Sequence, residues 1–156
     1  MSLNIMDRSL YFKGLLILSR IDKNVSTQEK EILKNVGNSL GFNKEFSEST
    51  INEVVNNKHL KDEPLKFSNQ QIANMFLRDA IKLAFCDSNL DEKEYNWILE
   101  CAKMNEIPEK RIKEKITSLL NAEENSFRDQ LDVLNYDWQS FFLPVVKIRK
   151  NEEIKS

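Results

Sequence analysis

Two acidic turns carry the residues of this chain that are best suited to bind a metal ion. The first turn reads Asp-Lys-Asn-Val-Ser-Thr-Gln-Glu from Asp22 to Glu29, and the second reads Asp-Ser-Asn-Leu-Asp-Glu-Lys-Glu from Asp87 to Glu94. Carboxylate oxygens are the ligands that calcium, magnesium and manganese prefer in proteins. If the fold brings the two turns together, the carboxylates of Asp22, Glu29, Asp87 and Glu94 form one all-oxygen site for such a divalent cation.

Neither turn alone is a complete calcium-binding loop. Its spacing matches the second half of an EF-hand loop, with aspartate at the fifth position, an apolar residue at the eighth and glutamate at the twelfth. The first and third positions would fall on leucine, arginine or phenylalanine, which offer no ligand oxygen, and the usual glycine is replaced by Lys23 or Ser88. A cation site therefore needs ligands from both turns.

Part of each turn also has a purely structural explanation. Ser26 with Glu29, and Asp91 with Glu94, have the spacing of a capping box, in which two side chains bond the first free amides of a helix. The aspartates that open the two turns are not explained in this way. Each follows a predicted helix end, where a negative charge meets the negative end of the helix dipole.

The elements that would position these turns are helices. Apolar residues recur at intervals of three and four residues, and only three Gly and three Pro occur in 156 residues, which disfavours a turn-rich all-β fold. The first helix is apolar on most sides and should be central. The predicted helices run over Asp7 to Ile21, Ser26 to Leu40, Lys44 to Asn57, Gln70 to Cys86, Asp91 to Met104, and onward from Pro108.

A shift of 65 residues superimposes the first three predicted helices on the last three. Identities are few, but the apolar positions keep their register: Leu18 falls on Leu83 and Leu33 on Ile98. We therefore expect one all-α domain over residues 1–156, a compact bundle of about seven helices. It would contain two pseudo-symmetric three-helix repeats, about residues 9–57 and 74–122, packed face to face, with a polar linker over residues 58–69. Residues 123–156 form a C-terminal extension.

The turn motifs resemble the signature of a known family. The run from Leu16 to Leu40, with its Asp-x-x-Val-Ser-x-x-Glu, looks like the signature of the TerB-like family, and the run from Leu83 to Leu99 looks like its partner. This family includes tellurite-resistance TerB proteins and the N-terminal domain of a membrane-bound J-protein co-chaperone. Over roughly residues 10–121, the resemblance implies an all-helical bundle with a suspected acidic metal cluster. It also implies a partner-mediated stress response at the cytoplasmic face of the membrane, without catalysis.

The C-terminal extension contains the most apolar segment of the chain. This segment runs from Tyr136 to Ile148 and is interrupted by Pro144. One interpretation is a closing piece laid over the bundle, since most such aromatic side chains belong to a core. The other is a docking surface for a second copy or another protein, because exposed apolar patches usually mark interfaces. Trp138, Phe141 and Phe142 would then be the contact residues.

Several classes of function have no support in the sequence. The net charge of -2 gives no electrostatic reason to expect a nucleic-acid partner. With His59 as the only histidine and no Gly-rich loop, there is no catalytic triad, no histidine metal cluster and no phosphate cradle. Cys86 and Cys101 fall in apolar helical stretches and fit buried thiols in a reducing cytosol. No apolar run approaches the length of a membrane span.

We therefore expect a non-enzymatic, cytoplasmic helical module that binds calcium, magnesium or manganese at the paired acidic turns. Its partner would be another protein or a further copy of the chain, and any membrane association would be peripheral and mediated by partners. The main alternative is a metal-free adaptor or oligomerisation domain that works through its aromatic segment. An enzyme with an acidic metal centre lacks a candidate base or nucleophile.

Overall fold

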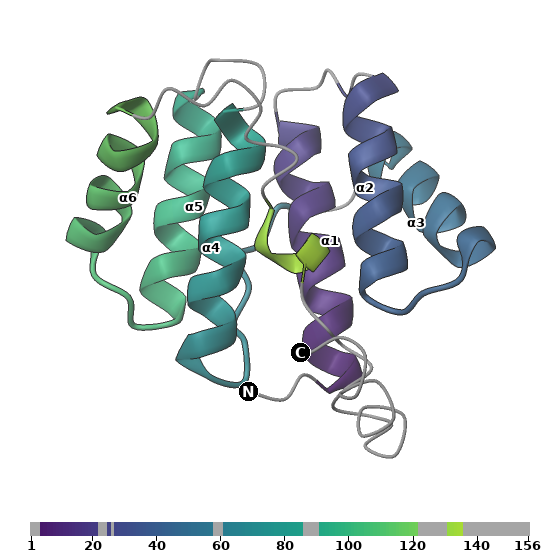
Figure 1. Ribbon diagram of the computed structural model, residues 1–156, viewed down its shortest axis with the longest axis horizontal. Helices are drawn as coiled ribbons and strands as arrows, with labels where there is room; N and C mark the ends of the chain where they lie inside the picture. The colour runs from purple at the N-terminus through teal and green to yellow at the C-terminus, as the bar shows by residue number, and fades with distance from the viewer. Residues whose placement is uncertain are drawn as a thin grey trace, which may run out of the picture.

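The computed structural model describes residues 4–21, 25, 27–57, 61–85, 91–121 and 131–135, and these residues form an all-helical bundle (Figure 1). No β-strand occurs within them, so the predicted fold class is confirmed. The elements in chain order are α1 (Ile5–Ile21), α2 (Thr27–Ser39), α3 (Lys44–Asn56), α4 (Gln70–Ala84), α5 (Glu92–Met104), α6 (Glu109–Asn121) and the short 3-10 helix η3 (Asp132–Asn135).

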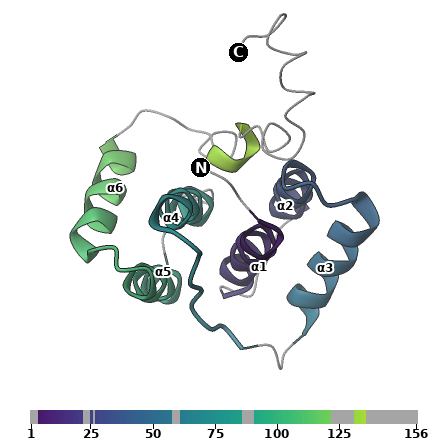
Figure 2. The same ribbon diagram turned by 90° about the horizontal axis from the view of Figure 1, so that it is seen from below.

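Helices α1 and α4 lie side by side at the centre of the bundle. Figure 2 shows α2 and α3 beside α1, and α5 and α6 beside α4 on the opposite side. The side chains of Tyr11, Leu15, Leu16 and Leu18 on α1 are completely buried, and so is Phe76 on α4. The apolar character of the first helix is therefore explained by its position, as the sequence predicted.

The two groups of three helices begin in the same register. Helices α4, α5 and α6 start at residues 70, 92 and 109, each 65 positions after the start of α1, α2 or α3. The first turns of α1 and α4 are capped in the same way. The Asn4 side chain accepts the Asp7 amide in α1, and the Asn69 side chain accepts the Ile72 amide in α4. Asparagine is a preferred N-cap because its short side chain reaches a free amide of the first turn.

The corners after α2 and α5 also correspond. Gly41 directly follows the predicted helix Ser26 to Leu40, and glycine at this position predicts a helix end in the left-handed region. Its backbone is left-handed, with a φ of 90°, and closes α2. Glu106, which lies 65 positions later, has a φ of 58° in the same left-handed region. A side chain in this conformation costs energy that glycine avoids, so the second corner carries strain that the first does not.

Close packing joins α1 to α4. A Cβ atom added to Gly14 would lie 2.5 Å from the Phe76 ring, so glycine at this position lets the ring lie against the α1 backbone. The rings of Tyr11 and Phe76 meet edge to face with centroids 5.3 Å apart, and Phe76 contacts Trp97 at 6.1 Å. This aromatic contact extends the core from α1 through α4 to α5.

The described part of the predicted linker, residues 61–69, contains no helix, but two of its side chains belong to the core. Leu65 and Phe67 are buried, at 8% and 4% exposure, and belong to the core. The Asn105 side chain holds this stretch, because its Nδ2 donates to the Leu65 carbonyl at 2.8 Å and its Oδ1 accepts from the Phe67 amide at 2.8 Å. Leu65 and Phe67 are therefore packed against the bundle and fix the path of the chain between α3 and α4.

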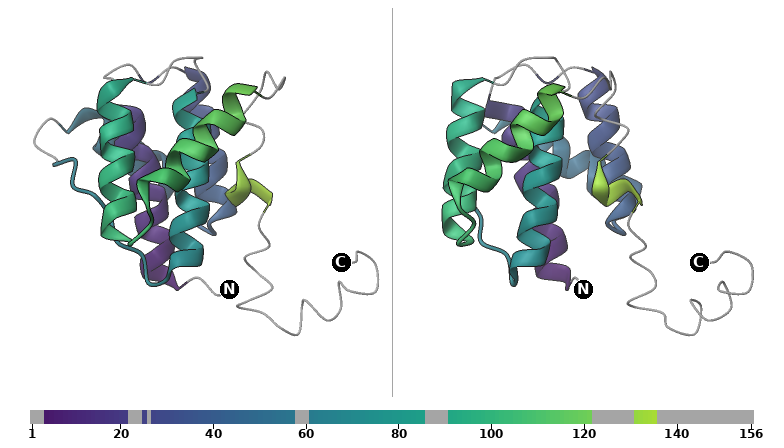
Figure 3. Two further views of the ribbon diagram at one scale, coloured as in Figure 1. Left: turned by 90° about the vertical axis from the view of Figure 1, so that its left-hand side faces the viewer. Right: turned by 60° about the vertical axis from the view of Figure 1, so that its left-hand side comes forward.

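The short helix η3 lies against both halves of the bundle. It contacts α2 in the first group of helices and α4 in the second, and Figure 3 shows it beside them. Leu131 and Val133 are completely buried. Within the described part of the extension, a single 3-10 turn thus joins the two groups, whereas the predicted closing piece from Tyr136 to Ile148 lies outside the described residues.

Candidate functional site

The acidic turns predicted to bind a cation are described only in part. Glu29 is half-buried at the start of α2, and Glu94 is buried, at 5% exposure, at the start of α5. Asp22 and Asp87 lie outside the described residues. The ends of α1 and α4 and the beginnings of α2 and α5 all lie at one end of the bundle (Figure 1). The helices flanking both turns therefore lead to the same end, and the four-carboxylate site stays a prediction.

The second turn contains the predicted capping box. The Glu94 carboxylate accepts the Asp91 amide at 3.2 Å, and the Asp91 side chain in turn caps the first amides of α5. The corresponding pair in the first turn includes Ser26, which lies outside the described residues. Capping thus accounts for the position of Glu94 without any ligand. No group of three or more His, Cys, Asp or Glu residues in the described ranges is arranged to hold a metal ion.

The most deeply buried polar site was not predicted from the sequence. Asp79 on α4 is completely buried, and its carboxylate accepts the Tyr11 hydroxyl from α1 at 2.6 Å. The same carboxylate accepts the backbone amides of Asp132 at 2.5 Å and Val133 at 3.0 Å, both in η3. We call these four residues the Asp79 latch. It connects one element from each group of helices to the chain that follows α6.

A second, more exposed layer holds the same turn. The Asp132 carboxylate accepts Arg78 Nε at 2.9 Å and Lys82 Nζ at 2.9 Å, both from α4. Lys82 is buried, whereas the Asp132 side chain is 30% exposed. Hydrogen bonds to charged groups are stronger than those between neutral groups. The backbone and the side chain of η3 are therefore both fixed by α4.

Burial sets the ionisation of the latch. It raises the pKa of Asp79 to about 6, although the hydrogen bonds from Tyr11, Asp132 and Val133 oppose this rise. Burial, together with the adjacent Asp79 carboxylate, also raises the pKa of Tyr11 well above its ordinary value. Burial alone would raise the pKa of Asp132 too, but the bonds from Arg78 and Lys82 hold it below its ordinary value.

The basic environment of the latch extends to α6. Burial lowers the pKa of Lys115, and the neighbouring charges of Lys82 and Arg78 lower it further. Three basic side chains from α4 and α6 thus lie within electrostatic range of η3. Tyr11 and Asp79 themselves have no exposed surface, so this arrangement is suited to holding the chain and not to reaching a substrate.

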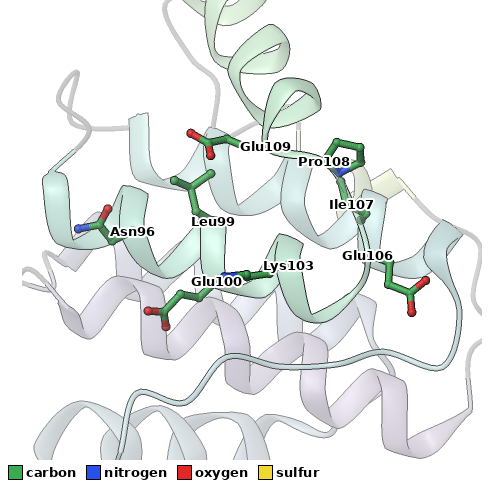
Figure 4. A pocket seen from close by; sticks show the side chains of 8 residues that line it. All are labelled: Asn96, Leu99, Glu100, Lys103, Glu106, Ile107, Pro108 and Glu109. Atoms are coloured by element: carbon green, nitrogen blue, oxygen red, sulfur yellow. The ribbon is translucent and has the colours of Figure 1, made fainter.

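A groove lies along α5 and the corner that leads into α6. It has a volume of about 700 Å³, and its lining side chains come from α5, from the corner at residues 106–108 and from the start of α6 (Figure 4). Leu99, Ile107 and Pro108 provide the apolar part. The charged side chains that line it are Glu100, Lys103, Glu106 and Glu109.

A second, smaller groove of about 370 Å³ lies between α1 and α3. It is lined by Phe12, Phe42 and Phe46, whose rings form a continuous row with centroids 5.7 Å and 5.0 Å apart. Phe46 is 47% exposed. Polar and charged side chains, among them Lys13 and Glu53, also line this groove beside the aromatic row.

The remaining candidate residues give no reaction centre. Cys101 is completely buried, as predicted, and burial raises its pKa to about 12, which rules out a reactive thiolate at neutral pH. Cys86, His59 and the predicted partner-binding residues Trp138, Phe141 and Phe142 lie outside the described residues. Within the described ranges, no helix combines the length and the apolar character that crossing a bilayer requires.

Comparison with known proteins gives no relative. No family model matches the chain, and neither a curated protein nor a solved structure matches it. The turn motifs and the geometry described above are therefore the features from which a function can be inferred.

Proposed function

We propose that this chain is a non-enzymatic TerB-like helical module that serves stress-linked assemblies by binding protein partners. The two acidic turns support this proposal, as does the arrangement of three helices on each side of the central α1–α4 pair. Helix starts that recur after 65 residues are what two pseudo-symmetric repeats require, which supports this part of the proposal. A cytoplasmic location, with membrane association only through partners, belongs to the same proposal.

One observation carries the partner-binding part of the proposal. The Asp79 latch fixes residues 131–135 against both halves of the bundle, and the apolar segment from Tyr136 to Ile148 follows directly in the sequence. Buried hydrogen bonds thus fix the residues that directly precede this segment in the sequence. Aromatic side chains presented from a fixed site are typical anchors of protein interfaces.

The experiment compares the wild-type chain with the triple variant Trp138→Ala/Phe141→Ala/Phe142→Ala. Sedimentation velocity measures self-association, and quantitative cross-linking in cells under stress measures association with other proteins. We expect the triple variant to lose the association while its melting temperature stays within a few degrees. A matched control, Phe46→Ala, removes an exposed aromatic side chain from the other groove. Equal association of all three proteins would contradict the proposal.

A divalent cation at the paired turns is the second candidate function. It is favoured by the common position of the helix ends that flank both turns, with Glu94 buried at that end. Calorimetric titration with calcium or manganese tests it, using Asp22→Ala/Asp87→Ala because these aspartates take no part in the capping box. We expect binding heat from the wild type and none from the variant. Absence of heat from the wild type, or equal heat from both, would contradict the cation site.

The alternative is a metal-free adaptor or oligomerisation domain that uses the aromatic segment alone. This alternative predicts association that is unchanged by EDTA and by the Asp22→Ala/Asp87→Ala substitutions. The TerB-like proposal with a cation predicts association that weakens in both cases. The two functions therefore separate in one sedimentation experiment with and without chelator.

A further inference from the structure

We propose that the groove along α5 and the α5–α6 corner receives the chain's own basic segment Leu143–Lys150. This segment reads Leu-Pro-Val-Val-Lys-Ile-Arg-Lys. The inference does not depend on partner binding, because it concerns a contact within one chain.

The groove has an excess of negative charge beside an apolar surface. Three carboxylates and one ammonium group, that of Lys103, line it. Glu109 is paired with Lys113 at 3.2 Å, but within the described part of the chain Glu100 and Glu106 form no ion pair. Ile107 is buried in the core and Leu99 is half-buried, so the apolar part is a continuation of the core. The groove therefore fits a segment that is both apolar and basic.

The segment Leu143–Lys150 has this composition. It carries three basic residues, Lys147, Arg149 and Lys150, and no acidic residue, and its other residues are apolar. In an extended conformation successive side chains point to opposite sides, so Val146 and Ile148 share one side. The long stems of lysine and arginine let their charges reach carboxylates at the edge of an apolar surface. The alternation of apolar and basic side chains in the segment therefore matches a groove in which apolar side chains lie beside glutamates.

The length of the intervening chain permits this contact. η3 is fixed on α4, and α4 packs against both α5 and α6. Packed helices lie roughly 10 Å apart, so the groove is about two helix spacings, or roughly 20 Å, from η3. The seven residues 136–142 span up to about 25 Å when extended. The latch therefore starts the segment close enough for the basic residues to reach the groove.

The strained corner adds a reason to assign a role to Glu106. In the first group of helices the corresponding corner is Gly41, which adopts the left-handed backbone without cost. The second corner places glutamate in that conformation at the edge of the groove (Figure 4). A strained residue is a ground for a functional hypothesis when its side chain lines a site.

The test is NMR spectroscopy of the full chain with methyl labelling. We expect cross-relaxation peaks between the Ile148 methyl groups and those of Leu99 or Ile107. Reversing the groove charge with Glu100→Lys/Glu106→Lys should remove these peaks and speed tryptic cleavage after Lys147 and Arg149 by about tenfold, the effect of losing several ion pairs at once. The additional reversal Lys147→Glu/Arg149→Glu should restore the peaks.

The control pair Glu31→Lys/Glu45→Lys changes two exposed carboxylates on α2 and α3 and should leave the peaks unchanged. Retained peaks at Leu119 and Ile98 in each variant establish that the bundle is folded. Absence of the Ile148 peaks in the folded wild type, or their survival in the groove variant, overturns the proposal. Peaks seen only between differently labelled molecules in a mixed sample also overturn it, because the groove would then hold a second copy.

Discussion

The buried carboxylate of Asp79 should make the stability of this protein fall as the pH rises through 6. The ordinary pKa of 3.8 is raised to about 6 in the folded chain, so between these values the folded state binds a proton that the unfolded state has released. The stabilisation is complete below about pH 4 and is lost above 6. Two pKa units correspond to about 3 kcal/mol in the free energy of unfolding.

The perturbation that isolates this effect is Asp79→Asn, which cannot ionise. The amide keeps one acceptor oxygen but turns an NH₂ group toward a donor, at a cost of about 1–2 kcal/mol for the lost hydrogen bond. At pH 7.5 this cost is offset, because the wild-type carboxylate is ionised and its burial lowers the free energy of unfolding of the wild type. At pH 5, which lies between the two pKa values, only about half of this offset is present. We therefore expect the stability of the variant relative to wild type to increase by about 1–2 kcal/mol from pH 5 to pH 7.5.

Urea unfolding followed by circular dichroism at pH 4.5, 5.5, 6.5 and 7.5 measures this difference. The quantity of interest is the wild-type free energy of unfolding minus that of the variant, because other titrating groups cancel. Asp132 acts in another window, since its lowered pKa gives stability that is lost only below the ordinary value of 3.8. A difference that stays constant from pH 4.5 to 7.5, or that grows with pH, would refute the reasoning.

Three further predictions concern packing, strain and reactivity. Gly14→Ala should destabilise the bundle by about 1–3 kcal/mol in urea unfolding, because its Cβ would lie 2.5 Å from the Phe76 ring; an unchanged midpoint would mean that the ring moves freely. Glu106→Gly should raise the free energy of unfolding by roughly 1 kcal/mol by relieving the left-handed backbone, whereas a thermal melt shifted downward would show that the side chain is needed for stability. Cys101 should react with a thiol reagent only in denaturant, because its pKa is raised to about 12; rapid labelling of the native protein in a Cys86→Ser background would contradict its burial.

The local features of the fold could be read from the sequence because they depend on short-range chemistry. Apolar periodicity located the helices, and their boundaries differ from the predicted ones by at most two residues, as at the start of α1, which begins at Ile5 and not at Asp7. Gly41 and the Asp91–Glu94 capping box were predicted from residue type and spacing alone. In each case the interacting groups lie within a few residues of one another, so no knowledge of the tertiary fold was needed.

The latch could not be predicted because its partners are distant in sequence. Tyr11 and Asp132 lie 68 and 53 residues from Asp79. One signal was available: Asp79 falls on the apolar face of its helix, three residues after Phe76 and next to Ala80, where a charge needs buried partners. The burial of Leu65 and Phe67 could not be predicted either, because two apolar residues in a polar stretch are too few to show the period of a helix or a strand. Whether Asp22 and Asp87 meet stays a prediction.

The latch also has a consequence for biosynthesis. Its acceptor, Asp79, is made midway through the chain, while the amides that satisfy it belong to residues 132 and 133, which are made after α6. Until η3 arrives, the carboxylate has only Tyr11 as a described partner and must remain hydrated or protonated, which opposes tight closure of α1 on α4. A chain that ends before residue 131 is therefore left with a loosened centre that a cell's proteases can recognise. Closure of α1 on α4 thus requires that synthesis has passed residue 133.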